Sequence, residues 1–346
     1  MGTMETARTK RNWPRIEAAH EAIGGWALAE GTLRLYRLAV ADFYIFCEDH
    51  GLNPEPFDFK TVVRYVNFHK QRPGTRDRAV APSTVGCRIA ALKRLSRTYR
   101  DLYGEKWPVL ESQALDDAIK KYNQWYYKEK RFRKHQAPPV RVRDLPSAMG
   151  AFNLQTVKGR RDATILLLTC AIAARESEVA ALDVADIVFD RDVARITWYA
   201  SKRNTYGHEE VATVHANNYN PFICPYSRLR DWVDELAEHG VTGKMPLFSK
   251  GKSPNKWPRQ WRRINATDVQ YVFERAGEAC GIPEATGHSG RRGGAADLYG
   301  AGKDVLDVKD KLRLASADVA AGYAKGYRDA AREVSVDVYR QAAEGR

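Results

Sequence analysis

Hydrophobic residues recur at a spacing of three and four positions over most of the N-terminal third of the chain, which predicts a run of α-helices. Proline and glycine interrupt this pattern and mark the helix limits. The expected helices span residues 14–29, 32–50, 58–72, 82–103 and 111–131. The apolar face of the second helix consists of Leu35, Leu38, Phe43 and Phe46. We therefore expect an all-α domain over residues 14–134, preceded by a disordered basic tail at 1–13.

A proline pair within a dense run of basic side chains ends the helical pattern. Pro138 and Pro139 exclude a helix and stiffen the backbone. We interpret residues 135–146 as an interdomain linker. The dense basic charge of residues 128–146 indicates that this stretch lies along a phosphate backbone.

Helical and strand patterns are mixed in the remaining residues, 147–346. An apolar run predicts a helix over 159–174, and another helical segment begins at Arg175. Residues 194–215 alternate between apolar and polar side chains around a turn at Asn204–Gly207, which predicts a β-hairpin. The expected fold class is therefore multidomain: an all-α domain, then a mixed α+β domain that is mainly helical with a small antiparallel sheet.

The charge of the chain is strongly positive and unevenly distributed. Its 56 Lys and Arg residues exceed its 43 Asp and Glu residues, giving a net charge of +13 and a pI near 9.5. Residues 1–143 carry 27 basic and 16 acidic side chains, whereas residues 144–346 carry 29 and 27. This excess fits a polyanionic partner attracted mainly by the N-terminal half, with solubility alone as the alternative.

The cysteines and the longest apolar runs favour an intracellular protein. The five cysteines are widely spaced and lie mostly in apolar helical patterns, so we expect reduced core residues and neither a disulfide framework nor zinc ligands. The longest apolar run, 163–174, is too short to span a membrane, and no signal-peptide pattern is present.

The helix expected at 82–103 combines a core face with a cationic face. Residues 83–100 contain five basic and no acidic side chains, which favours contact with DNA over a merely solvated face. The candidate DNA-contact residues over the whole chain are Arg34, Arg37, Arg88, Lys93, Arg94, Arg97, Lys134, Arg141, Lys256, Arg259, Arg262 and Arg263.

A second basic stretch, residues 244–263, has seven basic residues and no acid. Trp257 and Trp261 are interleaved with them. One interpretation is a loop that leads into a DNA-contacting helix at 266–280. The other is a solvated basic loop with the two tryptophans packed beneath it.

Five side chains, with Glu178 as the partner of the first, provide the parts needed to break a phosphodiester without a metal. In chain order, with Glu178 included, they are Arg175, Glu178, Lys202, His288, Arg291 and Tyr323. Two guanidiniums can hold the non-bridging oxygens of one phosphate, and a tyrosine hydroxyl can attack it to form a phosphotyrosine ester. A lysine on a mobile hairpin can protonate the leaving 5′-oxygen. Each motif alone also fits a structural or solvated pair.

The order and separation of these residues resemble those of the tyrosine recombinases (phage integrase family), most closely the Cre-like members. The family motif R-x-x-E matches Arg175 and Glu178, the hairpin lysine matches Lys202, and H-x-x-R begins at His288. The nucleophile matches Tyr323. The resemblance covers almost the whole chain and implies a helical core-binding (SAM-like) domain, whose second and fourth helices face DNA, followed by a catalytic domain.

The sequence departs from the family pattern at one position. Nine residues before the tyrosine the family usually has His or Trp, which helps to hold the scissile phosphate, and this chain has Leu314. Leucine cannot donate a hydrogen bond, but it can support the tyrosine helix by packing, while Lys311 or Arg313 reaches the phosphate. Tyr327 is a rival nucleophile on the same helix face as Tyr323.

The resemblance implies a site-specific DNA recombinase that needs no metal, ATP or other cofactor. It implies a chain that is monomeric in solution and acts on double-stranded DNA as a homotetramer on two inverted-repeat sites. The amphipathic segment 332–346 would dock on the neighbouring protomer or cap its own domain. Two other functions remain open: a type IB topoisomerase, and a catalytically decayed DNA-binding protein on the same scaffold.

Overall fold

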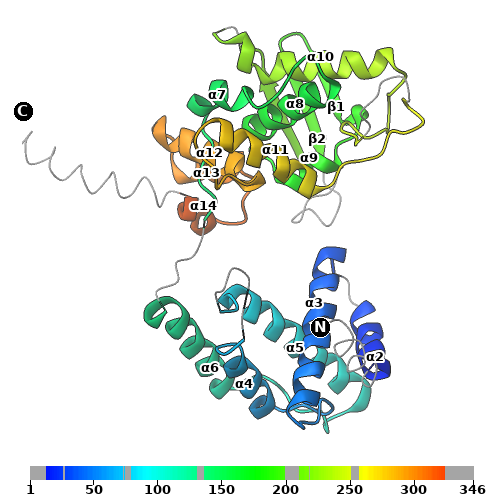
Figure 1. Cartoon of the computed structure of the whole chain (residues 1–346), viewed down its shortest axis with the longest axis vertical. Coiled ribbons are helices and arrows are strands. Elements are labelled where there is room, and N and C mark those ends of the chain that lie inside the picture. The colour runs from blue at the N-terminus through cyan, green and yellow to red at the C-terminus, as the bar shows by residue number, and fades with distance from the viewer. Residues whose placement is uncertain are drawn as a thin grey trace, which may run out of the picture. The chain divides into compact units, whose positions relative to one another are not determined.

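The computed structural model divides into two compact units with a boundary between residues 135 and 136. It describes residues 13–25, 28–72, 74, 79–130, 136–198, 210–217, 219–250 and 257–323 (Figure 1). Of the tail expected at 1–13, residues 1–12 lie outside the described residues, and Trp13 is the first residue of a helix. Within the described ranges, no helix is both long and apolar enough to cross a membrane.

The N-terminal unit is helical, as predicted. Its elements are α2 (Trp13–Gly24), α3 (Glu30–Asp49), α4 (Phe59–Phe68), α5 (Pro82–Tyr103), α6 (Gln113–Gln124) and the π-helical turn η2 (Trp125–Glu129). The first residues of two of these helices, α4 and α5, follow directly from the sequence. The Asp58 side chain accepts a hydrogen bond from the Thr61 backbone N–H at 2.8 Å, and Pro82 is the first residue of α5.

The core of this unit is rich in aromatic side chains. Phe43 contacts Phe57 and Tyr65 edge to face, with ring centroids 5.2 Å apart in both pairs. The expectation that Leu35 and Leu38 share this buried face is wrong, because they are 55% and 60% exposed. Only the C-terminal half of α3 is buried against the other helices; its first turns present leucine to the surface.

The second unit combines helices with one small sheet. Its elements up to the sheet are η3 (Val142–Asp144), α7 (Leu145–Met149), α8 (Val157–Ile172), α9 (Glu176–Ala181), η4 (Val184–Asp186), β1 (Ile187–Asp190), β2 (Val193–Trp198) and β3 (Glu210–His215). They are followed by η5 (Pro221–Ile223), α10 (Pro225–Glu238), α11 (Ala266–Ala279), α12 (Gly287–Gly300), α13 (Val305–Lys311) and α14 (Ala317–Tyr323). The predicted mixed α+β domain is thus confirmed.

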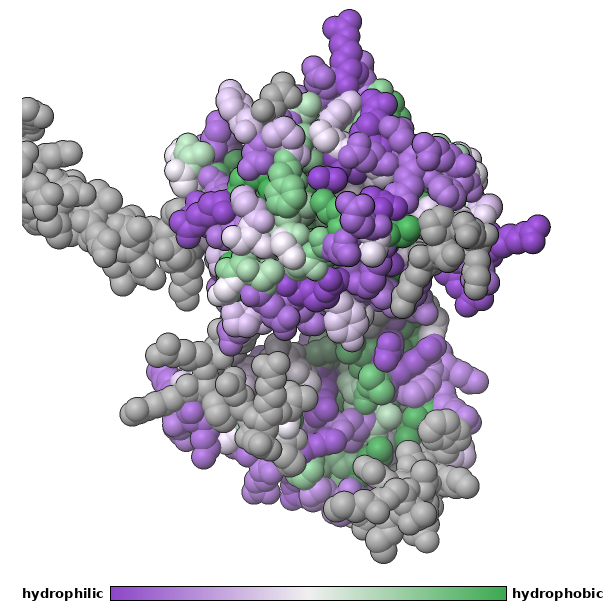
Figure 2. Space-filling view, turned by 45° about the horizontal axis from the view of Figure 1, so that its top comes forward, coloured by the Kyte–Doolittle hydropathy of each residue, from purple (hydrophilic) through white to green (hydrophobic). Residues whose placement is uncertain are grey.

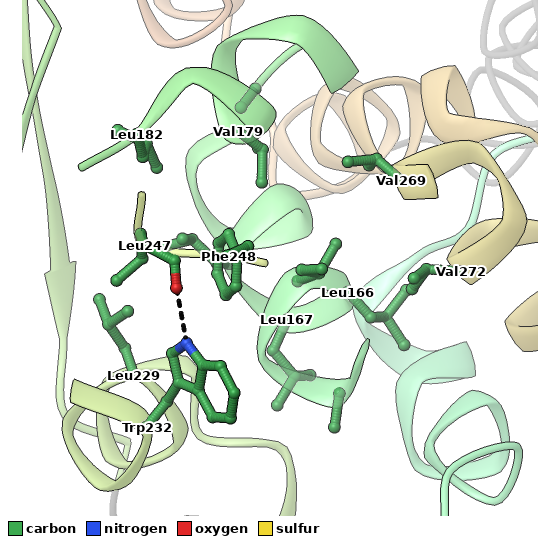
Figure 3. Close-up of a cluster of buried hydrophobic side chains, with 14 of the residues drawn as sticks. Leu166, Leu167, Val179, Leu182, Leu229, Trp232, Leu247, Phe248, Val269 and Val272 are labelled. Atoms are coloured by element: carbon green, nitrogen blue, oxygen red, sulfur yellow. Dashed lines mark hydrogen bonds between the residues drawn. The ribbon is translucent and has the colours of Figure 1, made fainter. Parts of the chain in front are cut away.

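The middle of helix α8 forms the centre of this unit. Buried residues follow one another from Ala163 to Leu168, so every face of this part of the helix is packed against other elements. Helices α10, α11 and α12 pack against it. Figure 3 shows Leu166 and Leu167 among side chains of α10 and α11, such as Trp232 and Val269. Within the same cluster the Trp232 indole donates a hydrogen bond to the Leu247 carbonyl at 3.0 Å (Figure 3).

The sheet is antiparallel, with strand order β1-β2-β3. Strands β2 and β3 form the predicted hairpin, with Val193 opposite His215 and Trp198 opposite Glu210. Its turn, together with Lys202, lies outside the described residues. The additional strand β1 pairs Ile187 with Ile196 and was not predicted, because it is only four residues long.

The stretch expected to be a linker contacts the second unit from residue 136 onward. Val140 is 1% exposed, and its backbone N–H donates to the Ser289 carbonyl at 3.0 Å. The Arg141 side chain donates to Asp297 at 2.7 Å. Proline does exclude a helix here, but the extended segment packs on α12.

We expect Gly293→Ala to destabilise the second unit by about 1 to 3 kcal/mol, the usual cost of overpacking. A Cβ at Gly293 would lie 1.7 Å from the Val140 carbonyl oxygen, so the extended segment would have to move off α12. Thermal unfolding measures the change. Gly86→Ala in α5 is the matched control, because a Cβ there meets no atom within 4 Å and should leave stability unchanged or slightly higher. Equal melting temperatures for the two variants would contradict the prediction.

Candidate active site

Helix α12 holds the His-x-x-Arg pair, and its arginine is one of the most buried polar side chains described. Arg291 is 1% exposed. Its guanidinium donates to the Ala173 carbonyl at 2.6 Å and also to the Leu312 carbonyl. A buried guanidinium cannot bond to water, so the two carbonyls accept hydrogen bonds from two of its five N–H donors and fix the plane of the group. The fixed plane also sets the direction of the remaining donors.

Both accepting carbonyls lie beside left-handed backbone. Ala173, the C-cap of α8, has φ 49°, and Arg313, directly after Leu312, has φ 49°. For residues other than glycine this conformation costs about 1 to 3 kcal/mol and persists only where the surroundings hold it. The strain is therefore concentrated around Arg291.

Arg175 and Glu178 form a close pair at the start of α9. The Glu178 carboxylate accepts from the Arg175 backbone N–H at 2.9 Å and from the Arg175 guanidinium. Burial alone would raise the pKa of Glu178, but this N–H and the charges of Arg313 and Arg175 hold that pKa below its ordinary value. Glu178 is thus an anion that orients Arg175, whose side chain is still 23% exposed.

Tyr323 contacts the His-x-x-Arg face of α12 from the end of α14. Its hydroxyl lies 3.2 Å from Nε2 of His288, and the guanidinium carbon of Arg292 lies 5.9 Å from the centre of its ring. Burial and the charge of Arg175 lower the pKa of Arg291, and the nearby Tyr323 side chain partly opposes this shift. The structure therefore brings Arg175, Glu178, His288, Arg291 and Tyr323 together in one chain.

His288 is suited to accept the proton of the tyrosine hydroxyl. Burial lowers its pKa, as do the positive charges of Arg291, Arg292 and Arg175, while Glu176 partly opposes them. At neutral pH the imidazole is therefore uncharged, with a lone pair available for a proton.

The same shift predicts the pH dependence of tyrosine attack. Only neutral His288 accepts a proton, so we expect the rate of attack to fall on acidification with a midpoint below the ordinary histidine pKa of about 6.5. Single-turnover rates of covalent protein–DNA adduct formation from neutral to acidic pH measure the profile. A midpoint at or above the ordinary value would contradict a depressed pKa, and His288→Gln should remove this acid limb.

Leu314 occupies the position of the missing family donor and is 6% exposed. It packs in a small apolar cluster that includes Ala320 of α14, with Tyr299 and Tyr323 against it. Leu314 therefore supports the helix that carries Tyr323. Lys202, Tyr327 and the segment 332–346 lie outside the described residues, so their predicted roles stay predictions.

Three residues near the site were not singled out as site residues. Arg292 follows Arg291 directly, and its Nε is buried without a hydrogen-bond partner among the described residues. Trp198, the last residue of β2, and Glu210, the first residue of β3, both contact Arg313. The sequence shows that Arg292 adjoins Arg291. The contacts of Trp198 and Glu210 with Arg313 could not be predicted from the sequence, because they join distant parts of the chain.

The basic face of α5 is partly neutralised by acids from other parts of the chain, although residues 83–100 themselves contain no acid. Three pairs account for this: Arg88 with Asp42 at 3.0 Å, Lys93 with Asp116 at 3.2 Å, and Arg97 with Glu111. Arg94 is half-buried on the same helix, and Arg34 and Arg37 on α3 are exposed. DNA contact by these residues stays a prediction.

A groove of about 510 Å³ separates α3 from α5. It is lined by Leu35 and Leu38 on one side, by Ser83 and Cys87 on the other, and by the Asp42–Arg88 pair. Both units carry hydrophobic areas among hydrophilic ones on the face seen in Figure 2. Apolar side chains flanked by arginine suit contact with the edges of bases.

The basic stretch of the second unit follows the second of its two interpretations in part. Trp257 and Trp261 are each 8% exposed and pack against Trp232. Arg263 is a structural residue, because it donates to the Ala181 carbonyl at 2.6 Å and pairs with Asp183. The helix predicted at 266–280 is confirmed as α11. Arg259 and Arg262 are exposed, while Lys134 and Lys256 lie outside the described residues.

Comparison with known sequences identifies relatives. The phage integrase family model matches residues 141–327, more than half of the chain. An integrase/recombinase xerD homolog from Selenomonas ruminantium is 25% identical over 300 residues, which are 85% of this chain and 81% of that protein. Tyrosine recombinase XerC from Corynebacterium glutamicum is 25% identical over 209 residues, which are 56% of this chain and 61% of that protein.

Solved structures share the fold. A XerH site-specific recombinase bound to a palindromic difH substrate gives a TM-score of 0.65 at 15% identity, covering 88% of this chain and 78% of that chain. A lambda integrase dimer bound to a COC′ core site gives 0.59 at 14% identity, covering 89% and 93%. At these identities the likeness shows the fold alone. The evidence for the chemistry comes from the site described above.

Proposed function

The chain belongs to the phage integrase family and is a tyrosine-type site-specific recombinase, and from this premise we propose that Tyr323 cleaves DNA by forming a covalent 3′-phosphotyrosine. The observation that carries the proposal is the 3.2 Å contact between the Tyr323 hydroxyl and Nε2 of His288. It joins a nucleophile to a neutral base beside the guanidinium of Arg291. Because all three side chains belong to one chain, each protomer supplies its own nucleophile.

In the cleavage step, the phenol oxygen of Tyr323 bonds to the scissile phosphorus while the bond from phosphorus to the 5′-oxygen breaks. The phenol proton passes to His288, and Arg175 and Arg291 balance the charge on the non-bridging oxygens. Lys202 protonates the leaving 5′-oxygen. A 5′-hydroxyl from the partner strand then attacks the phosphotyrosine and releases Tyr323, so the bond energy is conserved and no ATP is consumed.

The groove between α3 and α5 is proposed to contact the DNA site. These helices are the second and fourth of the N-terminal unit, the two that face DNA in the family that the sequence resembles. Exposed Leu35 and Leu38 suit apolar contact with thymine methyl groups, and the nearby arginines suit guanine edges and phosphates. We further propose two inverted half-sites for two protomers, a tetramer in the synapse, and location in the compartment that holds the DNA. The likeness to Cre-like members stays a prediction.

A suicide-substrate assay tests the proposed chemistry. Nicked duplexes that carry sequences flanking the gene, chosen because the protein binds them, are incubated with it in EDTA, and denaturing gels are read for a protein–DNA adduct. Mass spectrometry of the adduct identifies the linked residue. An adduct at Tyr323 that forms in EDTA supports the proposal, whereas tight binding without any adduct contradicts it and favours the catalytically decayed alternative.

The type IB topoisomerase alternative predicts a different dependence on sequence. Such an enzyme relaxes supercoiled plasmids that lack the bound site, whereas a site-specific recombinase leaves them supercoiled. Plasmids with and without the site, incubated side by side, distinguish the two. The helical N-terminal unit and its groove favour recognition of a specific site.

A further inference from the structure

Arg313 makes contacts with four separate elements of the second unit: α8, α9, β2 and β3. Its guanidinium donates to the second carboxylate oxygen of Glu178 at 2.9 Å and to the Ile172 carbonyl at 3.3 Å. Its Nε lies 3.6 Å from the Glu210 carboxylate, and its guanidinium carbon lies 4.6 Å from the centre of the Trp198 ring. The side chain is only 15% exposed. A solvated surface arginine would not collect such a set of partners.

Two of these partners form the base of the hairpin that carries Lys202. Trp198 ends β2, Glu210 begins β3, and the two residues face each other in the sheet. Arg313 stacks on one and pairs with the other. The guanidinium therefore joins the hairpin base to Glu178, which is the residue that orients Arg175.

The contact with Glu178 decides what Arg175 can offer a phosphate. Glu178 has two oxygens: the Arg313 guanidinium and the Arg175 backbone N–H donate to one, and the Arg175 guanidinium donates to the other. A carboxylate free of Arg313 could accept both arms of the Arg175 guanidinium in the bidentate geometry that this pair favours. That arrangement would turn the donors of Arg175 away from a ligand.

We propose that Arg313 is a positioning residue of the catalytic centre, which holds Glu178 so that Arg175 keeps donors for the phosphate and which fixes the hairpin base to the same point. The inference rests on the proposed function, since it concerns the efficiency of tyrosine attack. The left-handed backbone at Arg313, with φ 49°, fits this role. A strained conformation persists where the contacts of the residue hold it in place.

Arg313→Gly tests the role, because glycine removes the guanidinium and adopts the left-handed backbone without strain. We expect the single-turnover rate of adduct formation on the suicide duplex to fall roughly 100-fold, the effect of a small misplacement of a catalytic group, with unchanged DNA affinity. Arg191→Gly is the matched control. Arg191 also has a positive φ, 51°, but its side chain is exposed in the β1–β2 turn, so the variant should keep the wild-type rate.

A double-mutant cycle with Glu178→Gln shows whether Arg313 acts through Glu178. If it does, Arg313→Gly should add little to the loss that Glu178→Gln already causes. Free guanidinium at low, non-denaturing concentration should restore part of the rate in Arg313→Gly and none in the double variant. Full multiplication of the two losses would overturn the inference and place Arg313 directly on the phosphate.

The remaining outcomes are also decisive. A wild-type rate in Arg313→Gly overturns the inference alone, and a wild-type chain that forms no adduct overturns the proposed function with it. If the glycine variant does not fold, Arg313→Lys takes its place in the same cycle. Lysine keeps the charge but cannot both stack and bond two partners in the arginine geometry, so a wild-type rate in that variant also overturns the inference.

Discussion

Replacing Tyr323 by phenylalanine is expected to abolish adduct formation, with a loss of roughly 10⁴-fold or more, while DNA affinity stays the same. The change removes only the hydroxyl that would bond to phosphorus. The ring can still pack against the apolar cluster around Leu314 and beneath Arg292. Losing the contact with His288 should lower the free energy of unfolding by about 1 kcal/mol.

Two tyrosine controls make this result specific. Tyr299→Phe removes a hydroxyl from the same cluster, where it donates to the Ala320 carbonyl at 3.1 Å, and should keep most of the activity. Tyr327→Phe tests the rival nucleophile and should form the adduct as the wild type does. Adduct that persists in Tyr323→Phe and disappears in Tyr327→Phe would reassign the nucleophile to Tyr327.

The sequence was sufficient to predict those features that depend on residues close together in the chain. The helices of the N-terminal unit follow from periodic apolar residues and from punctuation such as the Asp58 cap. Arg175 and Glu178 lie three residues apart at a helix start, so their pairing is a local event. His288 and Arg291 share a helix face for the same reason. Motif order then supplied Tyr323, whose contact with His288 spans 35 positions.

The sequence was insufficient wherever partners come from distant elements. Asp42, Asp116 and Glu111 lie 14 to 46 positions from their basic partners on α5, so an acid-free window could not reveal them. The Arg263 guanidinium binds carbonyls at the end of α9, about 80 positions earlier. Leu35 and Leu38 have the helical spacing of a core face, but the neighbouring helices do not cover that part of α3.

Arg313 was identified from the sequence, but its contacts were not. Its position next to Leu314 predicts that it can replace the missing phosphate donor. Its contacts lead elsewhere, to Glu178 and to the base of the hairpin. Neither contact follows from spacing, because Glu178 lies 135 positions away. A left-handed arginine is also invisible in a residue pattern, since glycine is the residue expected at such a backbone.

Arg291→Lys is expected to lower the rate of adduct formation roughly 10²- to 10³-fold, the usual effect of removing a transition-state donor. An ammonium is a compact charge that cannot bond the Ala173 and Leu312 carbonyls and also present a flat pair of donors to a phosphate. Leaving one of these buried carbonyls unpaired should cost about 1 to 3 kcal/mol of stability. Single-turnover rates and thermal unfolding measure the two effects.

The matched control separates the catalytic loss from the structural one. Arg161 is 9% exposed and donates to the Ser249 carbonyl at 2.6 Å, so Arg161→Lys should lose comparable stability. It makes no contact with Tyr323 or His288 among the described residues, and its adduct rate should match the wild type wherever the protein is folded. If Arg291→Lys and Arg161→Lys lose adduct rate equally at a temperature where both variants are folded, the role of Arg291 is only structural. A loss confined to Arg291→Lys assigns this buried guanidinium to the phosphate, because burial and carbonyl pairing are common to both arginines.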